Sequence, residues 1–272
     1  VLAPLGPLRS RVVPRAEGRP ARGAELAQLE AEVSAALDAG ALGVSWGPYH
    51  ANALMDEGEL ARAVAVAARR GKPYCVHRRS EGTKGLEATQ EAVSLARATG
   101  VRLQISHLKA AGRLSWSQFE PVLDCVEAAR RDHDVAVDLY PYDASLTYLS
   151  AVIPDRLKAA GQLLDVLGSP EGWRDALAGV HRWFEERQGP ELIVLLAPAL
   201  EGLERGVTVA EAASTLGSLD PAETILRLIQ ADPAGTGGWA TYRHMMAPEQ
   251  VEQILDLGFA AIASDAVPEE GG

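Results

Sequence analysis

The chain has 272 residues, enough for one large domain or two small ones, and its 47% hydrophobic and 23% charged residues are ordinary for a globular protein. Its formal net charge of -11 argues against nucleic-acid binding, which requires a basic face for the phosphate backbone. The absence of an apolar run of about 18 residues predicts no membrane span, and the low cysteine content favours the cytoplasm as a reducing compartment.

Helical patterns and short apolar stretches alternate along the chain. Residues 1–24, rich in proline and arginine, are predicted to be an irregular entry segment, and residues 25–272 to form one folded portion. Apolar residues at helical spacing predict helices over 25–39, 57–70, 86–99, 116–131, 173–187, 209–216, 221–231 and 248–257. Short apolar runs between them predict strands over 42–46, 74–77, 101–106, 135–139, 192–196, 241–244 and 259–263.

This alternation predicts an α/β fold with a parallel sheet. The rhythm alone is compatible with a TIM-like (β/α) barrel and with an open, doubly wound sheet. About seven strands are expected, and the last lies close to the end of the sequence. A barrel portion that is incomplete at both ends is the simplest interpretation. No glycine-rich nucleotide-binding motif is present, which disfavours a nucleotide site.

Three polar residues lie at the carboxyl ends of predicted strands. They are His77, His107 and Asp265. Active sites of parallel α/β folds gather at the carboxyl ends of the strands, and imidazole and carboxylate are usual ligands of Zn²⁺. A single histidine at such a position is more often a hydrogen-bonded structural residue. Three equivalent positions together weaken that interpretation, but position alone does not decide between it and a metal site.

Three motifs carry more information than position alone. Residues 74–82 read YCVHRRSEG, residues 104–112 read QISHLKAAG, and residues 138–147 read DLYPYDASLT. In this order and spacing they resemble motifs of the N-acyl-D-amino-acid deacylases, a family of the amidohydrolase superfamily. The flanking segments 39–45 (AGALGVS), 206–232 and 262–265 (IASD) resemble the same family, so the resemblance covers nearly the whole chain.

The resemblance implies a TIM-like barrel with a small β-sandwich that hydrolyses the amide of N-acyl-D-amino acids with one tightly held zinc ion. His77 and His107 then take the positions of zinc-side histidines, and Asp265 that of the catalytic acid/base. Lys109 and Tyr140 match residues that hold the substrate carboxylate.

Two further residues belong to the same motifs. Ser145 matches another polar substrate contact, although the spacing there is loose. Arg79 is part of the family's H-x-R signature and receives no role.

The sequence also departs from the family pattern. The family's H-x-H strand, its bridging cysteine and an arginine beyond the final aspartate have no counterpart here. We therefore expect the chain alone to be a weak or inactive enzyme, completed by a missing N-terminal segment or a partner chain. Two alternatives stay open at this point: another amidohydrolase, such as a cyclic-amide hydrolase, and a non-catalytic barrel fragment. The first usually carries a carbamylated lysine, and no lysine stands at a suitable strand end before His77.

Overall fold

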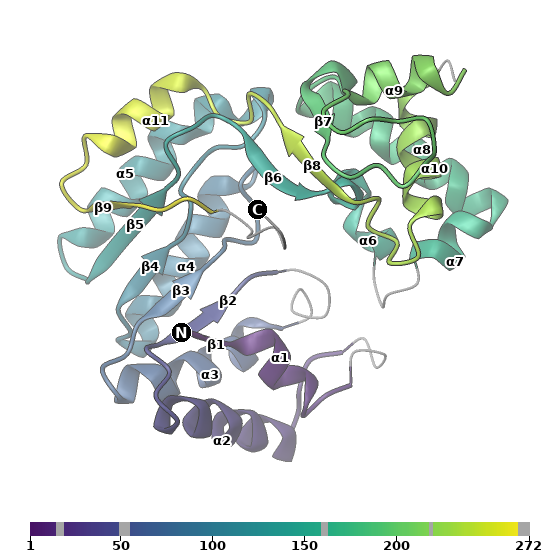
Figure 1. Cartoon of the computed structure of the whole chain (residues 1–272). Helices are drawn as coiled ribbons and strands as arrows, with labels where there is room; N and C mark the ends of the chain where they lie inside the picture. The colour runs from purple at the N-terminus through teal and green to yellow at the C-terminus, as the bar shows by residue number, and fades with distance from the viewer. Residues whose placement is uncertain (15–18, 49–54, 159–162, 218–219, 266–272) are drawn as a thin grey trace. The chain divides into compact units, whose positions relative to one another are not determined.

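The computed structural model describes residues 1–14, 19–48, 55–158, 163–217 and 220–265 (Figure 1). The chain divides into two compact units, where the sequence predicted one folded portion over 25–272. Unit 1 comprises Val1–Ala110, Ser117–Pro141 and Glu252–Ser264. Unit 2 comprises Ala111–Trp116 and Tyr142–Val251, and the chain returns to it at Asp265. None of the helices within the described ranges is long and apolar enough to cross a lipid bilayer.

Unit 1 is built on a six-stranded sheet whose neighbouring strands are all parallel. The strands follow the order β1 (Ala3–Pro4), β2 (Val44–Trp46), β3 (Tyr74–Val76), β4 (Leu103–Ile105), β5 (Val135–Leu139) and β9 (Ala260–Ile262). A doubly wound sheet reverses its strand order at a switch point, whereas this order follows the chain without reversal. The predicted α/β class with a parallel sheet is confirmed, and the strand order is that of a barrel.

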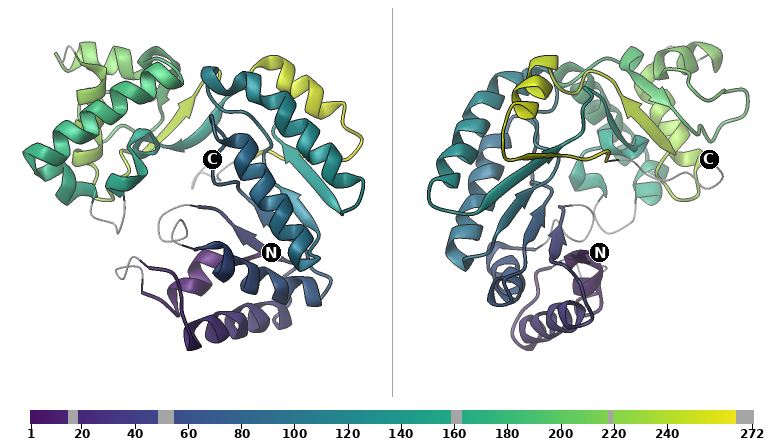
Figure 2. Two further views of the ribbon diagram at one scale, coloured as in Figure 1. Left: turned by 180° about the vertical axis from the view of Figure 1, so that it is seen from behind. Right: turned by 60° about the vertical axis from the view of Figure 1, so that its left-hand side comes forward.

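Each pair of successive strands from β1 to β5 is joined through at least one helix. These are α1 (Leu5–Ser10), α2 (Ala24–Asp38), α3 (Glu57–Arg69), α4 (Gly85–Thr99) and α5 (Phe119–Arg130), with a 3-10 turn, η3 (Arg113–Gln118), before α5. Figure 2 shows α3, α4 and α5 along one face of the sheet. Helix α4 ends where the sequence predicted, at Gly100, whose φ of 71° is in the left-handed region that glycine adopts without strain.

Burial alternates along the strands because successive side chains point to opposite faces. In β2, β3 and β4 the outer two residues are buried and the middle one is half-buried. The half-buried set is short or polar, with Ser45, Cys75 and Gln104 in register on neighbouring strands. In these three strands the polar side chains therefore lie on one face of the sheet. His77, two residues after Cys75, continues the alternation on the same face.

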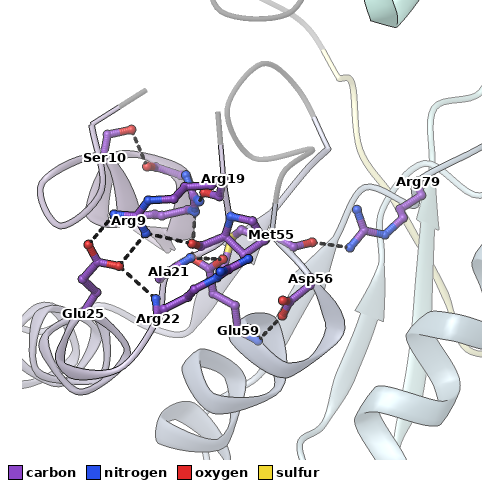
Figure 3. A network of polar contacts seen from close by, with 12 residues as sticks. Arg9, Ser10, Arg19, Ala21, Arg22, Glu25, Met55, Asp56, Glu59 and Arg79 are labelled. Carbon is purple, nitrogen blue, oxygen red and sulfur yellow. Dashed lines mark hydrogen bonds and ion pairs between the residues drawn. The ribbon is translucent and has the colours of Figure 1, made fainter. Parts of the chain in front are cut away.

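The entry segment is more ordered than the sequence predicted, since β1 and α1 both lie within residues 1–24. Arg9 of α1 donates through Nε to Oε1 of Glu59 on α3 at 2.7 Å, and the two side chains are only 1% and 0% exposed. The other carboxylate oxygen of Glu59 accepts from the backbone N–H of Ala21 at 3.1 Å, and Arg9 also donates to the carbonyl oxygen of Arg19. We call these four residues the entry network (Figure 3). The proline and arginine content of residues 1–24 predicted irregular structure. Composition alone cannot reveal ion pairs with residues far along the chain, such as Glu59. Residues 15–18 of this segment lie outside the described ranges.

Unit 2 contains a separate antiparallel sheet in the order β6 (Ser145–Tyr148), β8 (Trp239–Tyr242) and β7 (Ile193–Leu195). The strands expected at 192–196 and 241–244 belong to this sheet and not to the parallel sheet of unit 1. The apolar run of β7 is buried at every position, which by sequence alone looks like a barrel strand.

Helices complete unit 2 and cover an apolar core of its own. They are α6 (Asp155–Lys158), α7 (Leu163–Gly168), α8 (Pro170–Glu186), α9 (Val209–Thr215) and α10 (Pro221–Ala231), with 3-10 turns η4 (Leu149–Val152) and η6 (Pro190–Leu192). Helix α9 begins with a capping box between Thr208 and Glu211. Ser169 caps α8 ahead of a proline, so this helix begins three residues before the predicted start at residue 173. Helix α11 (Pro248–Leu255) then carries the chain towards β9.

Candidate metal centre

His77 and His107 are brought together at the carboxyl ends of two neighbouring strands. His77 directly follows β3, and His107 lies two residues after β4. Nδ1 of His77 and Nε2 of His107 are 2.7 Å apart, and the rings meet edge to face with their centroids 4.5 Å apart. One of these nitrogens must therefore carry the hydrogen that the other accepts.

Glu81 is a third member of this cluster, and sequence reasoning missed it. Its Oε1 lies 2.7 Å from Nδ1 of His107, and its side chain is 12% exposed. The residue stands four positions after His77 inside the quoted motif YCVHRRSEG, so its position was visible. What the sequence did not reveal is that the loop after β3 turns this carboxylate back towards the second histidine.

Lys109 completes the group, which we call the histidine cluster: His77, Glu81, His107 and Lys109. The ammonium nitrogen of Lys109 lies 2.9 Å from Oε1 of Glu81, 2.9 Å from Nδ1 of His107 and 3.2 Å from the carbonyl oxygen of His107. It also lies 5.1 Å from the centre of the Tyr140 ring, within the range of a cation–π interaction. The structure thus brings together four residues that the sequence singled out, His77, His107, Lys109 and Tyr140, and adds Glu81.

The loop that carries His107 is held by Asp138 of β5. The backbone N–H of His107 donates to Oδ1 of Asp138 at 2.7 Å, and Gln104 donates to Oδ2 at 2.7 Å. These bonds hold His107 at a φ of 38°, a left-handed conformation that is uncommon for a residue with a side chain. Asp138 therefore positions the histidine without touching its ring.

Arg78 ties the loop after β3 to the loop after β4. It is only 1% exposed and donates to the carbonyl oxygen of Lys109 at 2.6 Å and to Oγ1 of Thr89 at 3.0 Å. Its neighbour Arg79, the residue noted in the H-x-R signature, instead pairs with Glu91 at 2.6 Å and lies over the Trp46 ring. The arginine that supports the histidine cluster is thus the first of the pair.

The environment sets the charge states in the cluster. Burial lowers the pKa of His77 to about 3, opposed by the charge of Glu81, so this imidazole is neutral at physiological pH. Burial raises the pKa of Glu81, but the charge of Lys109, together with the interactions with His107 and His77, outweighs it and holds that pKa well below its usual range. Glu81 is therefore ionised, and His77 keeps a nitrogen lone pair that is free of positive charge.

The donor set fits a metal ion. One ligand atom from each of His77, Glu81 and His107 lies within 4.8 Å of the others. Imidazole nitrogens are usual ligands of Zn²⁺, and two nitrogens on one tetrahedral ion lie about 3.3 Å apart. The two facing nitrogens, at 2.7 Å, need to separate only slightly to receive an ion.

Two predicted residues are not part of this group. Asp265 follows β9, which pairs with β5, but it is exposed, has a φ of 50° and is the first residue returned to unit 2. Ser145 is the first residue of β6, opposite Tyr242 in the antiparallel sheet of unit 2. Their roles remain predictions from the motifs.

Comparison with known proteins extends over nearly the whole chain. No family model matches it. D-aminoacylase of Alcaligenes xylosoxydans xylosoxydans is 28% identical over 264 residues, which are 97% of this chain and 46% of that protein. N-acyl-D-glutamate deacylase of the same organism is 35% identical over 140 residues, which are 51% of this chain and 28% of that protein. The chain thus spans about half the length of the D-aminoacylase, and less of the glutamate enzyme.

Solved structures give the same answer. A crystal structure of D-aminoacylase, described as defining a novel subset of amidohydrolases, aligns with a TM-score of 0.69 and 28% identity, covering 95% of this chain and 46% of its own. N-acyl-D-glutamate deacylase from Bordetella bronchiseptica, solved with zinc and a phosphonate mimic of the tetrahedral intermediate, aligns with a TM-score of 0.71 and 25% identity over 95% of this chain and 46% of its own. Sequence and structure therefore confirm that this chain resembles the D-aminoacylase family of the amidohydrolases from end to end.

Proposed function

We propose that this chain forms the zinc-binding portion of an N-acyl-D-amino-acid deacylase, which hydrolyses the amide bond to a carboxylic acid and a free D-amino acid. The observation that carries the proposal is the histidine cluster: two facing imidazoles on adjacent strands, with a buried ammonium beside them. The relatives are named for the deacylation of D-amino acids, and one neighbour was solved with zinc.

We propose a role for each of the site residues. His77 and His107 would hold zinc, which when bound lowers the pKa of water and polarises a carbonyl oxygen. Both rings are anchored to neighbouring strands, and neutral His77 offers a lone pair. We propose Asp265 as the carboxylate that takes a proton from the attacking water and returns it to the leaving nitrogen, because it matches the family's catalytic carboxylate and lies three residues after β9 of the same sheet.

The substrate carboxylate would bind at Lys109. This ammonium is 5% exposed, so a charge-assisted hydrogen bond to it is little weakened by water. Glu81 already accepts from Lys109 at 2.9 Å, so an incoming carboxylate must share or replace that contact. Tyr140, whose ring lies beneath the ammonium, and Ser145 complete the proposed substrate contacts.

Other parts of the proposal concern what surrounds the chain. The chain spans 46% of D-aminoacylase, and we propose that further metal ligands and the carboxylate-binding arginine come from a segment beyond these 272 residues or from a partner chain. We place the protein in the cytoplasm, in keeping with its two free thiols, Cys75 and Cys125.

A metal titration of the purified chain tests the proposal most directly. We expect one zinc ion per chain by calorimetry, with binding lost in His77→Ala and in His107→Ala. His181→Ala is the matched control, because His181 pairs with Asp220 in unit 2, away from the cluster in sequence. Zinc-dependent release of D-amino acids from their N-acetyl derivatives, with the L-enantiomers untouched, would add the activity. Zinc binding that survives both histidine substitutions would rule the site out.

A further inference from the structure

We infer that Glu81 is a positioning residue which fixes the tautomer of His107 and is not itself a metal ligand. The inference rests on the proposed function only in taking the two histidines as the metal-binding pair. It concerns a residue to which the motifs and the comparisons assign no role.

The direction of each contact carries the argument. Glu81 meets His107 at Nδ1, at 2.7 Å, whereas His77 meets the same ring at Nε2, also at 2.7 Å. The two nitrogens of an imidazole project their lone pairs or hydrogens to opposite sides of the ring. An ion between the two histidines would therefore lie on the Nε2 side, and Glu81 lies on the other. The carboxylate of Glu81 is close to the proposed metal position, but it faces Nδ1 of His107 and not the Nε2 that would bind the ion.

The hydrogen on Nδ1 follows from the neighbouring groups. Two hydrogen-bond acceptors at 2.7 Å would repel each other, so Nδ1 of His107 must donate to the carboxylate of Glu81. The alternative, in which Nδ1 accepts from Lys109 at 2.9 Å, would leave that repulsion in place. Lys109 does not need Nδ1, because it has the carboxylate at 2.9 Å and the carbonyl oxygen of His107 at 3.2 Å as acceptors.

Two consequences follow for metal binding. With its hydrogen on Nδ1, His107 presents the lone pair of Nε2 towards His77, as a ligand must. A carboxylate behind a ligating histidine both fixes the ring and raises its basicity, and losing such a partner typically lowers metal affinity by about 10- to 100-fold. In the metal-free chain the hydrogen of the 2.7 Å contact between the rings then belongs to Nδ1 of His77. Metal binding must move that hydrogen to the other nitrogen of His77, while His107 stays unchanged.

Nitrogen-15 NMR of the imidazoles in the metal-free wild-type chain tests the tautomer without any activity. We expect His107 to carry its hydrogen on Nδ1, and His77 to exchange Nδ1–H for Nε2–H when zinc is added. A wild-type His107 with hydrogen on Nε2 would overturn the inference. Because this readout needs no bound zinc, it stands even if the chain proves not to be a deacylase.

Glu81→Gln separates a positioning residue from a ligand. We expect its zinc dissociation constant to rise by about 10- to 100-fold, with the metal's coordination shell unchanged in X-ray absorption spectra. Glu91→Gln is the matched control: Glu91 is a nearby, largely buried carboxylate that pairs with Arg79, and its loss should leave the His107 tautomer and the zinc affinity unchanged. An oxygen ligand missing from the shell of Glu81→Gln, or an unchanged zinc affinity, would each contradict the inference.

Discussion

Among the described residues of unit 1, the entry network and the histidine cluster both enclose charged side chains, and the two differ in how completely the charges are matched. In the entry network, Arg9 and Glu59 pair one to one, and the second oxygen of Glu59 is taken by a backbone N–H. In the histidine cluster, the single carboxylate of Glu81 faces both an ammonium and an imidazole. Beyond it, two imidazoles meet nitrogen to nitrogen.

The difference teaches how to separate a structural buried charge from a functional one. A closed pair satisfies both partners and leaves no capacity for a ligand, so it serves to join α1 to α3. In the histidine cluster, two hydrogen-bond donors, Lys109 and His107, share one carboxylate. The cluster also holds two ring nitrogens close enough to bind one ion. Burial alone is a weaker guide, because the charged side chains of both regions are largely enclosed: Arg9 and Glu59 are 1% and 0% exposed, and Lys109, Glu81 and His107 are 5%, 12% and 13% exposed.

The largest expected effect breaks the closed pair. Glu59→Gln leaves the guanidinium of Arg9 buried without its carboxylate, and breaking such a pair typically costs about 3–5 kcal/mol in the free energy of unfolding. Chemical denaturation monitored by circular dichroism measures it. Glu30→Gln, which removes an exposed pair with Arg62 between α2 and α3, is the control and should cost about 1 kcal/mol or less. A similar cost for the two variants would mean that the entry network does not hold α1 in place.

A smaller effect is expected in substrate binding. Lys109→Met removes the proposed partner of the substrate carboxylate, and a hydrogen bond to a charged group contributes about 1.5–3 kcal/mol. In an active form of the enzyme, with the missing N-terminal strands restored, we expect KM for an N-acetyl-D-amino acid to rise by roughly 10- to 150-fold, with zinc content kept. The same substrate with its carboxylate amidated is the control, and its KM should change little. Equal damage to both substrates would assign Lys109 to the fold or to the metal.

The smallest effect is a pH dependence of the metal-free chain. The pKa of His77 is lowered by burial from 6.5 to about 3, so between these values the unfolded state binds a proton that the folded state does not. Stability is therefore fully present above pH 6.5 and falls as the pH falls, by up to about 1.4 kcal/mol per pH unit for one proton. Denaturation between pH 6.5 and about pH 5.5, above the range where most carboxylates titrate, should show this slope in the wild type and not in His77→Gln. Parallel curves for the two proteins would show that His77 is not buried as described.

Much of unit 1 could be predicted from the sequence, because its helices and strand order depend on residues that are close together along the chain. Helices over 25–39, 57–70 and 86–99 were predicted within a few residues of α2, α3 and α4, since a helix depends on residues three and four apart. A strand after each helix then determines a parallel sheet in chain order. The positions of His77 and His107 at strand ends followed from the same rhythm, together with the motifs around them.

The sheet of unit 2 could not be predicted in this way. It joins β6 to β8 across long stretches of chain, as the hydrogen bond between Tyr242 and the carbonyl of Tyr148 illustrates across 94 positions. An apolar run such as β7 reads the same whether it pairs in a barrel or in a separate sheet. Only the folded chain selects the partner, because strand pairing is a contact between segments and not a property of either one.

The sequence by itself determined the chemistry available after β3: a histidine, two adjacent arginines and a glutamate within five residues. Only the tertiary structure decided which partner each of these side chains contacts. Arg78 is buried against the carbonyl of Lys109, while Arg79 turns to Glu91, although the two side chains are chemically identical. Glu81 reaches His107 because the loop after β3 folds back over the end of β4. Side-chain direction in a loop depends on what packs against it, and neighbouring residues of one type carry no signal of which will be enclosed.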